Sequence, residues 1–497
     1  MTPAIMFQGT GSDVGKSLIV AGLCRLFTRQ GLTVRPFKPQ NMSNNAAPAL
    51  GPGGIYGEIG RAQALQARAA NTAPVTDMNP ILLKPQSEIG AQVVVDGIVT
   101  GNADARAYHA MKPGLLTTVR AAFERLSSEA DLILVEGAGS PAEVNLRDGD
   151  IANMGFAEAA DIPVALIGDI ERGGVIAALV GTWTLLNSTE QARLKGYIVN
   201  RFRGDPSLFD GALPIIAEHT GLPSLGVVPW FDGARALPAE DTASLEGRYS
   251  TAGWSAARIR IAVPKLPRIA NFDDLDPLAA EPDVAVRLVS PGESFPADAN
   301  LILLAGSKST RADLDELHLL GWTEAIRNAA DRGVHVVGLC GGYQMLGSRV
   351  ADPGGVEGNP GATPGLGLLD IETVIEGAKR LAPVHGVAAN GRPVHGFEMH
   401  MGRTTGPDTV RAFVTLEDGR PDGAMDSTGR IAGTYLHELF AADDFRHAYV
   451  SQIDNRVSAT IRWNDHIEVA LDRLADHMEA HIDTAQLLDI ARENRQE

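Results

Sequence analysis

A short apolar run, a glycine-rich loop and the start of a helix open this chain, and their order constrains the fold more than any other feature. The run AIMF (4–7) is typical of a buried strand, and the loop QGTGSDVGKS follows it directly. From Ser17 to Gln30 apolar residues recur at helical spacing, and Gly31 ends that pattern. A phosphate-binding loop must lie between a strand and a helix, where backbone N–H groups and the helix N-terminus face an anion. The sequence therefore predicts a nucleotide-binding α/β domain here.

Short apolar runs alternate with amphipathic stretches along most of the 497 residues, which is typical of α/β folds with mostly parallel sheets. This rhythm stops in a small, polar, non-periodic stretch around 242–256 and then restarts. We therefore expect two domains, each a mostly parallel sheet flanked by helices. The expected order is a phosphate-loop domain at 1–245, a linker at 246–256, a second domain at 257–443 and a helical C-terminal extension at 444–497.

The composition excludes several classes of function. A net charge of −18 argues against nucleic acid and against an anionic membrane surface as partners, because such partners require a basic face. No apolar run approaches the roughly 18 residues that a membrane span needs, and the N-terminus lacks the basic start of a signal peptide. With only Cys24 and Cys340, a disulfide framework is excluded, so we expect a cytoplasmic protein. The sequence indicates no oligomeric state.

The glycine loop carries residue types that bind a nucleoside triphosphate and its metal. Lys16 would reach the terminal phosphates, and the Ser17 hydroxyl would hold Mg²⁺. Glu136 ends the apolar run in DLILVEG (131–137), and open parallel sheets bind ligands outside the carboxyl ends of their strands. We predict Glu136 as a second Mg²⁺ ligand, with a helix cap as the alternative. Lys38, after a second predicted strand, would contact phosphate or a substrate carboxylate.

Three other acidic residues are weaker candidates in the same domain. Asp148 and Asp150 follow Glu136 closely, so they are expected near the same strand ends, with a role in metal or substrate positioning. A solvated loop explains these two aspartates about equally well. Glu58 is a third metal candidate.

A second chemical site is predicted around Cys340, in VVGLCGGYQML (336–346). An apolar strand, a G-x-C-x-G turn and a helix are typical of a nucleophile elbow with cysteine in place of serine. The helix N-terminus favours the thiolate, and the Gly341 N–H is placed to stabilise an oxyanion. His437, in GTYLHELF, is the predicted base, although a histidine in such a run is more often structural. Cys24 lies within a helix on a packing face and is expected to be core.

The phosphate loop has five residues between Gly9 and Gly15, one more than the common spacing, and this resembles the dethiobiotin synthetase-like ATPases. The VEGAG strand end also occurs in that family. The resemblance implies that the loop, with Thr10, Gly11 and Gly15, binds ATP and that the γ-phosphate passes to a carboxylate. It also matches Asn200, in YIVNRF, to an asparagine that reads adenine. A buried polar residue at a strand end is an equally good interpretation of Asn200.

The cysteine site resembles the class I (triad-type) glutamine amidotransferases, which have a flavodoxin-like fold. In that family a glutamate usually follows the base by two residues, where this chain has Leu439, and Glu438 is adjacent instead. This departure is similar to the cobyrinate and cobyric acid branch, which resembles a Cys–His dyad, so the identity of a third member stays open. The segment LLAGSKST (303–310) matches the loop that supplies the second oxyanion donor, around Gly306 and Ser307.

Longer segments extend the resemblance to the cobyric acid synthase family over about residues 4–440. They are FKPQNMSNNAA, GEIGRAQALQARAA, DMNPILLKP, VEGAGSPAEVNLRDGDIANMGFAEAADIPV and HGFEMHMGRT. The resemblance implies a ligase that hydrolyses glutamine to ammonia and uses Mg²⁺ and ATP to activate carboxylates. The implied substrate is a corrinoid, adenosylcobyrinic acid a,c-diamide, amidated at its b, d, e and g propionates in cobalamin biosynthesis.

Two other functions stay open. Cobyrinic acid a,c-diamide synthase, which amidates the a and c acetates, has both sites, but the FKPQNM and NLRDGDIANMG segments favour the first interpretation. A phosphate-loop ATPase switch of the partitioning type carries an additional lysine near the start of its loop, where this chain has Gly9 and Thr10. Such a switch also has no use for a cysteine elbow.

Overall fold

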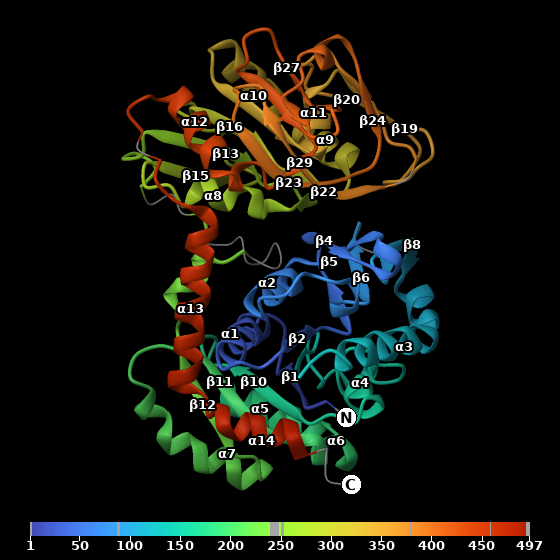
Figure 1. Cartoon of the computed structure of the whole chain (residues 1–497), viewed down its shortest axis with the longest axis vertical. Coiled ribbons are helices and arrows are strands. Elements are labelled where there is room, and N and C mark those ends of the chain that lie inside the picture. Colours follow the sequence, from blue (N-terminus) through green and yellow to red (C-terminus); the bar gives the residue numbers. More distant parts are fainter. Residues whose placement is uncertain are drawn as a thin grey trace. The chain divides into compact units, whose positions relative to one another are not determined.

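The computed structural model describes residues 2–86, 90–238, 248–249, 253–377, 379–457 and 459–493. The chain divides into two compact units (Figure 1). Unit 1 comprises Met1–Glu240 and Ile467–Glu497, and unit 2 comprises Asp241–His466. The linker expected at 246–256 lies partly outside the described residues. The last helices of the chain therefore group with the first unit.

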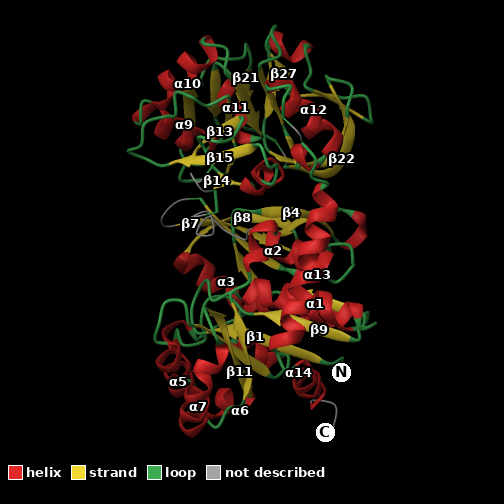
Figure 2. Cartoon of the chain, turned by 90° about the vertical axis from the view of Figure 1, so that its left-hand side faces the viewer, coloured by secondary structure: helices red, strands yellow, loops and turns green. Residues whose placement is uncertain are grey.

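The core of unit 1 is a six-stranded parallel sheet in the order β12-β11-β10-β1-β9-β2. Its central strand β1 is buried along its whole length, as expected for a strand covered by helices on both faces (Figure 2). The strands are β1 (Ala4–Gly9), β2 (Val34–Phe37), β9 (Leu132–Glu136), β10 (Val164–Asp169), β11 (Leu194–Phe202) and β12 (Ser224–Pro229). Because β1 and β9 are parallel, with Phe7 opposite Glu136, the phosphate loop and Glu136 emerge at the same sheet edge.

The helices of unit 1 include two from the C-terminal end of the chain. Leu474 and Met478 of α13 pack so closely on α1 that a Cβ at Gly22 would lie 2.6 Å from Met478 Cγ. Arg25 of α1 also pairs with Asp472 at 2.8 Å. The helices are α1 (Lys16–Arg29), α2 (Arg61–Ala69), α3 (Ala105–Ser127), α4 (Met154–Ala159), α5 (Val175–Leu185), α6 (Ser188–Arg193), α7 (Leu213–Thr220), α13 (Trp463–His481) and α14 (Thr484–Arg492).

Two small sheets lie between β2 and α3 in the chain, and the sequence patterns did not predict them. One is the β4–β5 hairpin, and the other has the order β3-β6-β7-β8. Strand β5 leads directly into α2, which faces the carboxyl end of β9. The strands are β3 (Gln40–Met42), β4 (Ala46–Leu50), β5 (Tyr56–Gly60), β6 (Ile81–Pro85), β7 (Gly90–Val95) and β8 (Ile98–Asp104).

Unit 2 is built on a second six-stranded sheet, in the order β15-β13-β16-β18-β28-β27, in which only the β27–β28 pair is antiparallel. The expectation of two α/β domains with mostly parallel sheets is confirmed. The strands are β13 (Ile259–Pro264), β15 (Val284–Val289), β16 (Leu301–Leu304), β18 (His335–Leu339), β27 (Ala424–Met425) and β28 (Ile431–Thr434). The helices are α8 (Asp276–Ala279), α9 (Thr310–Leu319), α10 (Trp322–Asp331), α11 (Gly341–Leu346) and α12 (Asp443–Ile453).

Two further sheets, in which all neighbouring strands except β19 and β21 are antiparallel, complete unit 2. One sheet has the order β20-β19-β21-β24, and another has the order β26-β25-β22-β23-β29. The second brings the short strand β29 (Leu436–His437) beside β23 (Pro393–His400), with Phe397 opposite His437. The remaining strands of these sheets are β19 (Arg349–Asp352), β20 (Gly361–Pro364), β21 (Glu372–Val374), β22 (Arg380–Ala388), β24 (Arg403–Thr405), β25 (Val414–Leu416) and β26 (Pro421–Asp422).

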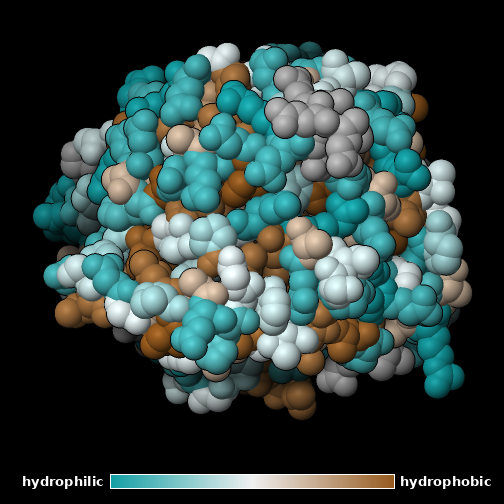
Figure 3. All heavy atoms as spheres, turned by 90° about the horizontal axis from the view of Figure 1, so that it is seen from below, coloured by the Kyte–Doolittle hydropathy of each residue, from teal (hydrophilic) through white to brown (hydrophobic). Residues whose placement is uncertain are grey.

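Hydrophilic and hydrophobic residues are interspersed on the face of the molecule seen in Figure 3. Among the described residues, none of the helices combines the length and the apolar character that crossing a membrane requires. The large apolar side chains gather instead inside the two units, beneath the helices that cover each parallel sheet.

Candidate functional site

The phosphate loop of unit 1 turns tightly around the side chain of Lys16. Its ammonium donates hydrogen bonds to the carbonyl oxygens of Gly11 and Gly139, both at 3.2 Å. A Cβ at Gly9 would lie 2.7 Å from the Gly11 oxygen and 2.9 Å from Lys16 Nζ, so this position has no room for a side chain. Gly15 has a φ of 92°, in the left-handed region that glycine adopts without strain. The glycines that the sequence singled out therefore shape a loop whose backbone can approach phosphate.

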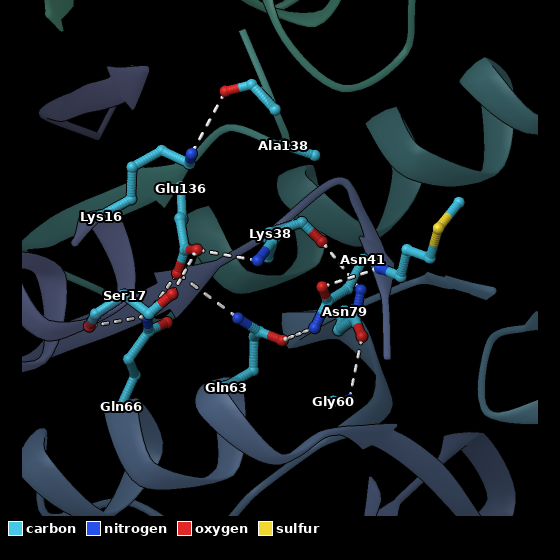
Figure 4. A network of polar contacts seen from close by, with 12 residues as sticks. Lys16, Ser17, Lys38, Asn41, Gly60, Gln63, Gln66, Asn79, Glu136 and Ala138 are labelled. Atoms are coloured by element: carbon cyan, nitrogen blue, oxygen red, sulfur yellow. Dashed lines mark hydrogen bonds and ion pairs between the residues drawn. The ribbon is translucent and has the colours of Figure 1, made fainter. Parts of the chain in front are cut away.

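Three predicted residues meet at the carboxyl end of β9 (Figure 4). The Ser17 hydroxyl donates to Glu136 Oε1 at 2.7 Å, and Lys38 Nζ pairs with the same oxygen at 2.7 Å. The Lys38 and Glu136 side chains are both buried. A hydroxyl and a carboxylate are the oxygen ligands that Mg²⁺ prefers, and Lys38 adds a positive charge for an anionic ligand. This set fits a magnesium–nucleotide site.

Two glutamines that the sequence analysis did not single out hold the other oxygen of the same carboxylate. Gln66 Nε2 donates to Glu136 Oε2 at 2.6 Å, and Gln63 Nε2 lies 3.5 Å from that oxygen. Asn41 Nδ2 in turn donates to Gln63 Oε1 at 2.8 Å. The three-residue spacing of the glutamines places them on one face of α2. That spacing, in RAQALQAR, is the signal that could have found them.

Asn200, near the carboxyl end of β11, contacts the phosphate loop. Its Nδ2 donates to the Val14 carbonyl at 2.8 Å, and a Cβ at Gly15 would lie 2.2 Å from the same nitrogen. The Thr10 N–H donates to the Ile167 carbonyl at 2.9 Å, so it also ties the loop to β10. Asn200 thus supports the loop, and its contact with adenine stays a prediction.

Two of the other acidic candidates, Glu58 and Asp150, make contacts within the protein. Glu58 pairs with Lys84 at 2.7 Å, and both side chains are buried. Asp148 is exposed. The Asp150 carboxylate accepts hydrogen bonds from backbone N–H groups at the start of α4, those of Ala152, Asn153 and Gly155. The metal or positioning roles of these three residues therefore stay predictions.

Within the described part of the chain, no three His, Cys, Asp or Glu side chains gather as a metal site. An ion held by Ser17 and Glu136 would therefore complete its shell with phosphate oxygens and water. Mg²⁺ commonly binds nucleotides in this way, with one or two protein ligands. The expected site is consistent with this chemistry.

In unit 2, Cys340 lies on a sharp turn between β18 and α11. Its φ of 52° and ψ of −107° are unusual for a residue with a side chain. A Cβ at Gly338 would lie 2.4 Å from the Gly342 oxygen, and one at Gly342 would lie 2.0 Å from the Leu304 oxygen. Because these neighbours are backbone atoms, both glycines are required by the turn. The predicted strand, sharp turn and helix around Cys340 are present, and the role of Cys340 as a nucleophile stays a prediction.

His437 lies between a carboxylate and the Cys340 thiol. Its Nδ1 is 2.7 Å from Asp274 Oδ2, and its ring stacks on Phe397 with centroids 5.2 Å apart. Burial lowers the pKa of His437, but the charges of Asp274 and Cys340 and hydrogen bonds to both outweigh burial and raise it to about 10. This arrangement favours a positively charged imidazole beside the cysteine.

Asp274 is the residue that the sequence analysis missed at this site. It lies in a short 3-10 helix, Phe272–Leu275, and its second oxygen accepts the Glu438 backbone N–H at 2.6 Å. Both carboxylate oxygens therefore hold the segment that carries the histidine. The resemblance implied a Cys–His pair with its third member open, and Asp274 occupies that position in the structure. The acidic run FDDLD among apolar neighbours was the available signal, since a buried carboxylate needs a partner.

The loop expected to supply the second oxyanion donor lies beside Gly341, and its role stays a prediction. A Cβ at Gly341 would lie 2.8 Å from Ser307 N, so the two backbone segments are adjacent. A Cβ at Gly306 would lie 3.2 Å from His437 Cε1, which places Gly306 against the base. The Ser307 hydroxyl donates to Asp313 at 2.6 Å, and burial raises the pKa of Asp313 to about 6. This bond holds the loop that was expected to supply the donor.

Comparison with known proteins matches both units. Residues 5–245 match the family described as the CobQ/CobB/MinD/ParA nucleotide binding domain, and residues 260–445 match the CobB/CobQ-like glutamine amidotransferase domain. Over 493 residues the chain is 57% identical to "Cobyric acid synthase" of Methylorubrum populi, covering 99% of this chain and 100% of that protein. It is 56% identical over 492 residues to the protein of that name from Azorhizobium caulinodans, with 99% and 100% coverage.

Proposed function

Because the chain belongs to the cobyric acid synthase family, we propose that it uses glutamine and ATP to amidate the b, d, e and g propionates of adenosylcobyrinic acid a,c-diamide. The product would be adenosylcobyric acid, in cobalamin biosynthesis. The observation that carries this proposal is the presence of two complementary sites in one chain. One is the Cys340–His437–Asp274 arrangement, and the other joins Ser17 and Glu136 at the phosphate loop.

Unit 2 would release ammonia from glutamine. The Asp274 carboxylate accepts the Nδ1–H of His437, so the other ring nitrogen can exchange a proton with Cys340. The thiolate attacks the side-chain amide carbon, and backbone N–H groups of Gly341 and Ser307 stabilise the oxyanion. His437 gives its proton to the departing nitrogen, ammonia leaves, and water hydrolyses the glutamyl thioester. Glutamate and free thiol are regenerated.

Unit 1 would activate the substrate carboxylate. Lys16 and the loop backbone hold the phosphates of ATP, and Lys38 neutralises charge between the substrate carboxylate and the γ-phosphate. Bound Mg²⁺, held by Ser17 and Glu136, would add charge stabilisation there. A carboxylate oxygen attacks the γ-phosphorus and ADP leaves. Ammonia then attacks the acyl phosphate carbon, a proton is lost, and inorganic phosphate leaves as the amide forms.

Mass spectrometry of adenosylcobyrinic acid a,c-diamide, incubated with the protein, Mg-ATP and glutamine, tests the proposal. We expect stepwise exchange of OH for NH₂, ending at four new amides. Failure to modify this compound, together with two new amides on cobyrinic acid, would instead assign the chain to the a,c-diamide reaction. If neither compound changes, the proposed substrate is wrong.

Two variants test the division of labour between the units. Cys340→Ser should lose glutamine-dependent amidation but keep amidation with an added ammonium salt. Lys16→Ala should lose amidation from either nitrogen source, since the phosphate loop then lacks the ammonium that binds the phosphates of ATP. Full glutamine-dependent activity in Cys340→Ser would contradict the assignment of the nucleophile.

A further inference from the structure

Glu136 is bound on two sides by different kinds of groups (Figure 4). Its Oε1 atom receives the Ser17 hydroxyl and the Lys38 ammonium, which are groups of the nucleotide site. Its Oε2 atom receives amide N–H groups from α2, with Gln66 at 2.6 Å and Gln63 at 3.5 Å. Hydrogen bonds to both oxygens restrict rotation of a carboxylate group. The amides and the groups of the nucleotide site therefore hold the plane of the Glu136 carboxylate in one orientation.

Gln66 also contacts the other residue predicted to bind the metal. Its Nε2 lies 3.3 Å from the Ser17 backbone carbonyl as well as 2.6 Å from Glu136. One amide group thus joins the backbone that carries the hydroxyl ligand to the side chain that carries the carboxylate ligand. A shift of this amide would move both ligands relative to each other.

The burial of the two glutamines argues against a role in packing alone. Gln63 and Gln66 are both completely buried, and burying an amide costs free energy unless its polar atoms are bonded. Asn41 donates a hydrogen bond to the side-chain oxygen of Gln63, whereas the side-chain oxygen of Gln66 has no hydrogen-bond partner among the described residues. An apolar side chain of similar size would fill the same volume but would take this donor away from the buried Glu136 carboxylate. The retained amide therefore points to a role at the site.

We infer that Gln66, supported by Gln63, is a positioning residue that orients Glu136 toward the metal of the nucleotide site. This inference rests on the proposed use of Mg-ATP by unit 1. Groups that orient metal ligands commonly change metal affinity by about 10- to 100-fold when they are removed.

The test measures Mn²⁺ binding to the full-length protein in the presence of a non-hydrolysable ATP analogue, by electron paramagnetic resonance. Mn²⁺ accepts the same oxygen ligands as Mg²⁺. We expect Gln66→Met to weaken Mn²⁺ binding by about 10-fold or more, and Gln63→Met to weaken it less because its bond is longer. The matched control is Gln191→Met, on α6. The side-chain amide of Gln191 donates a hydrogen bond to the Trp183 carbonyl and not to Glu136.

The outcomes separate positioning from structural support. A purely structural role would lower the melting temperature of Gln66→Met but leave Mn²⁺ affinity of the folded protein equal to that of Gln191→Met, and this result would overturn the inference. If Gln66→Met does not fold, Gln66→Asn replaces it, because its shorter amide stays polar but cannot reach both partners. Unchanged Mn²⁺ affinity in that variant would overturn the inference equally.

The experiment uses neither corrinoid nor glutamine, so it also separates this inference from the proposed function. A wild-type protein that binds no Mn²⁺ with the ATP analogue would contradict the proposed nucleotide site itself. A wild-type protein that binds Mn²⁺ while Gln66→Met binds it equally well would contradict only the positioning role.

Discussion

His437 Nδ1 lies 2.7 Å from Asp274 Oδ2, although 163 residues separate the two in the chain. The histidine comes from β29 and the aspartate from a 3-10 helix after β14 (Ile269–Ala270). The same carboxylate also accepts the backbone N–H of Glu438, so it fixes both the ring and the strand that carries it. An acidic partner of the base is therefore present, at a position that no short motif around His437 reveals.

Asp274→Asn should selectively impair glutamine hydrolysis. The Asn side chain has no negative charge with which to stabilise the imidazolium form of His437. We therefore expect the kcat of glutamine hydrolysis to fall by about 10²- to 10⁴-fold. Amidation with added ammonium salt should persist, because Asp274 lies in unit 2. Glu438→Gln, which keeps the backbone N–H, should have a much smaller effect. A larger loss in Glu438→Gln would identify the adjacent glutamate as the acid.

The pH dependence of stability should report the charge on His437. Its folded-state pKa of about 10 lies above its ordinary value of 6.5, so the protonated ring is favoured by folding. The contribution of protonated His437 to the free energy of unfolding is therefore fully present below about pH 6.5, and it is lost as the pH rises toward 10. The unfolding free energy of wild type should exceed that of His437→Gln by more at pH 6.5 than at pH 10. A difference that grows with pH would contradict the raised pKa.

Gly342→Ala should disrupt the cysteine turn. The added Cβ would lie 2.0 Å from the backbone oxygen of Leu304, and a backbone atom cannot move aside as a flexible side chain can. We expect a stability loss of about 1–3 kcal/mol or more, together with loss of glutaminase activity. Gly354→Ala is the control, since its nearest contact would be Val356 Cγ2 at 3.8 Å. Chemical denaturation and glutamate release measure both effects.

Lys84→Met should strongly destabilise unit 1. It removes the ammonium that pairs with the buried Glu58 carboxylate, and breaking such a pair typically costs about 3–5 kcal/mol. The double variant Lys84→Met/Glu58→Leu should recover much of this loss, because the buried carboxylate is removed together with the ammonium. Thermal unfolding measures both. If Glu58→Gln instead changed the Mg²⁺ requirement of amidation without a stability loss, the metal role considered for Glu58 would be supported.

Asn200→Ala distinguishes support of the loop from recognition of the base. Loss of the bond to the Val14 carbonyl should raise the KM for ATP, since the phosphate loop loses an anchor. If Asn200 only supports the loop, the KM values for ATP and GTP should rise in parallel. A change in the ratio of these two values would show that the side chain also reads adenine. Gln191→Met serves as a remote control in the same unit.

The sequence by itself determined the parts of both sites that are contiguous in the chain. The phosphate loop and the cysteine turn each combine a strand, fixed glycine positions and a helix start. Sterics restrict such a backbone so strongly that the pattern of residue types reveals it. The Gly338 and Gly342 contacts with backbone atoms show this restriction directly. The alternation of apolar runs likewise sufficed to predict two mostly parallel sheets.

Only the tertiary structure decided which distant side chains complete the two sites. Gln66 reaches Glu136 because β5 turns into α2 beside the carboxyl end of β9, and Asp274 reaches His437 across unrelated elements. The tertiary structure also pairs Glu58 with Lys84. Hydrophobic periodicity identifies the buried face of each element but not the neighbour against which that face packs. A local spacing such as that of Gln63 and Gln66 can draw attention to polar side chains, but the residues with which they pair become visible only once the chain is folded.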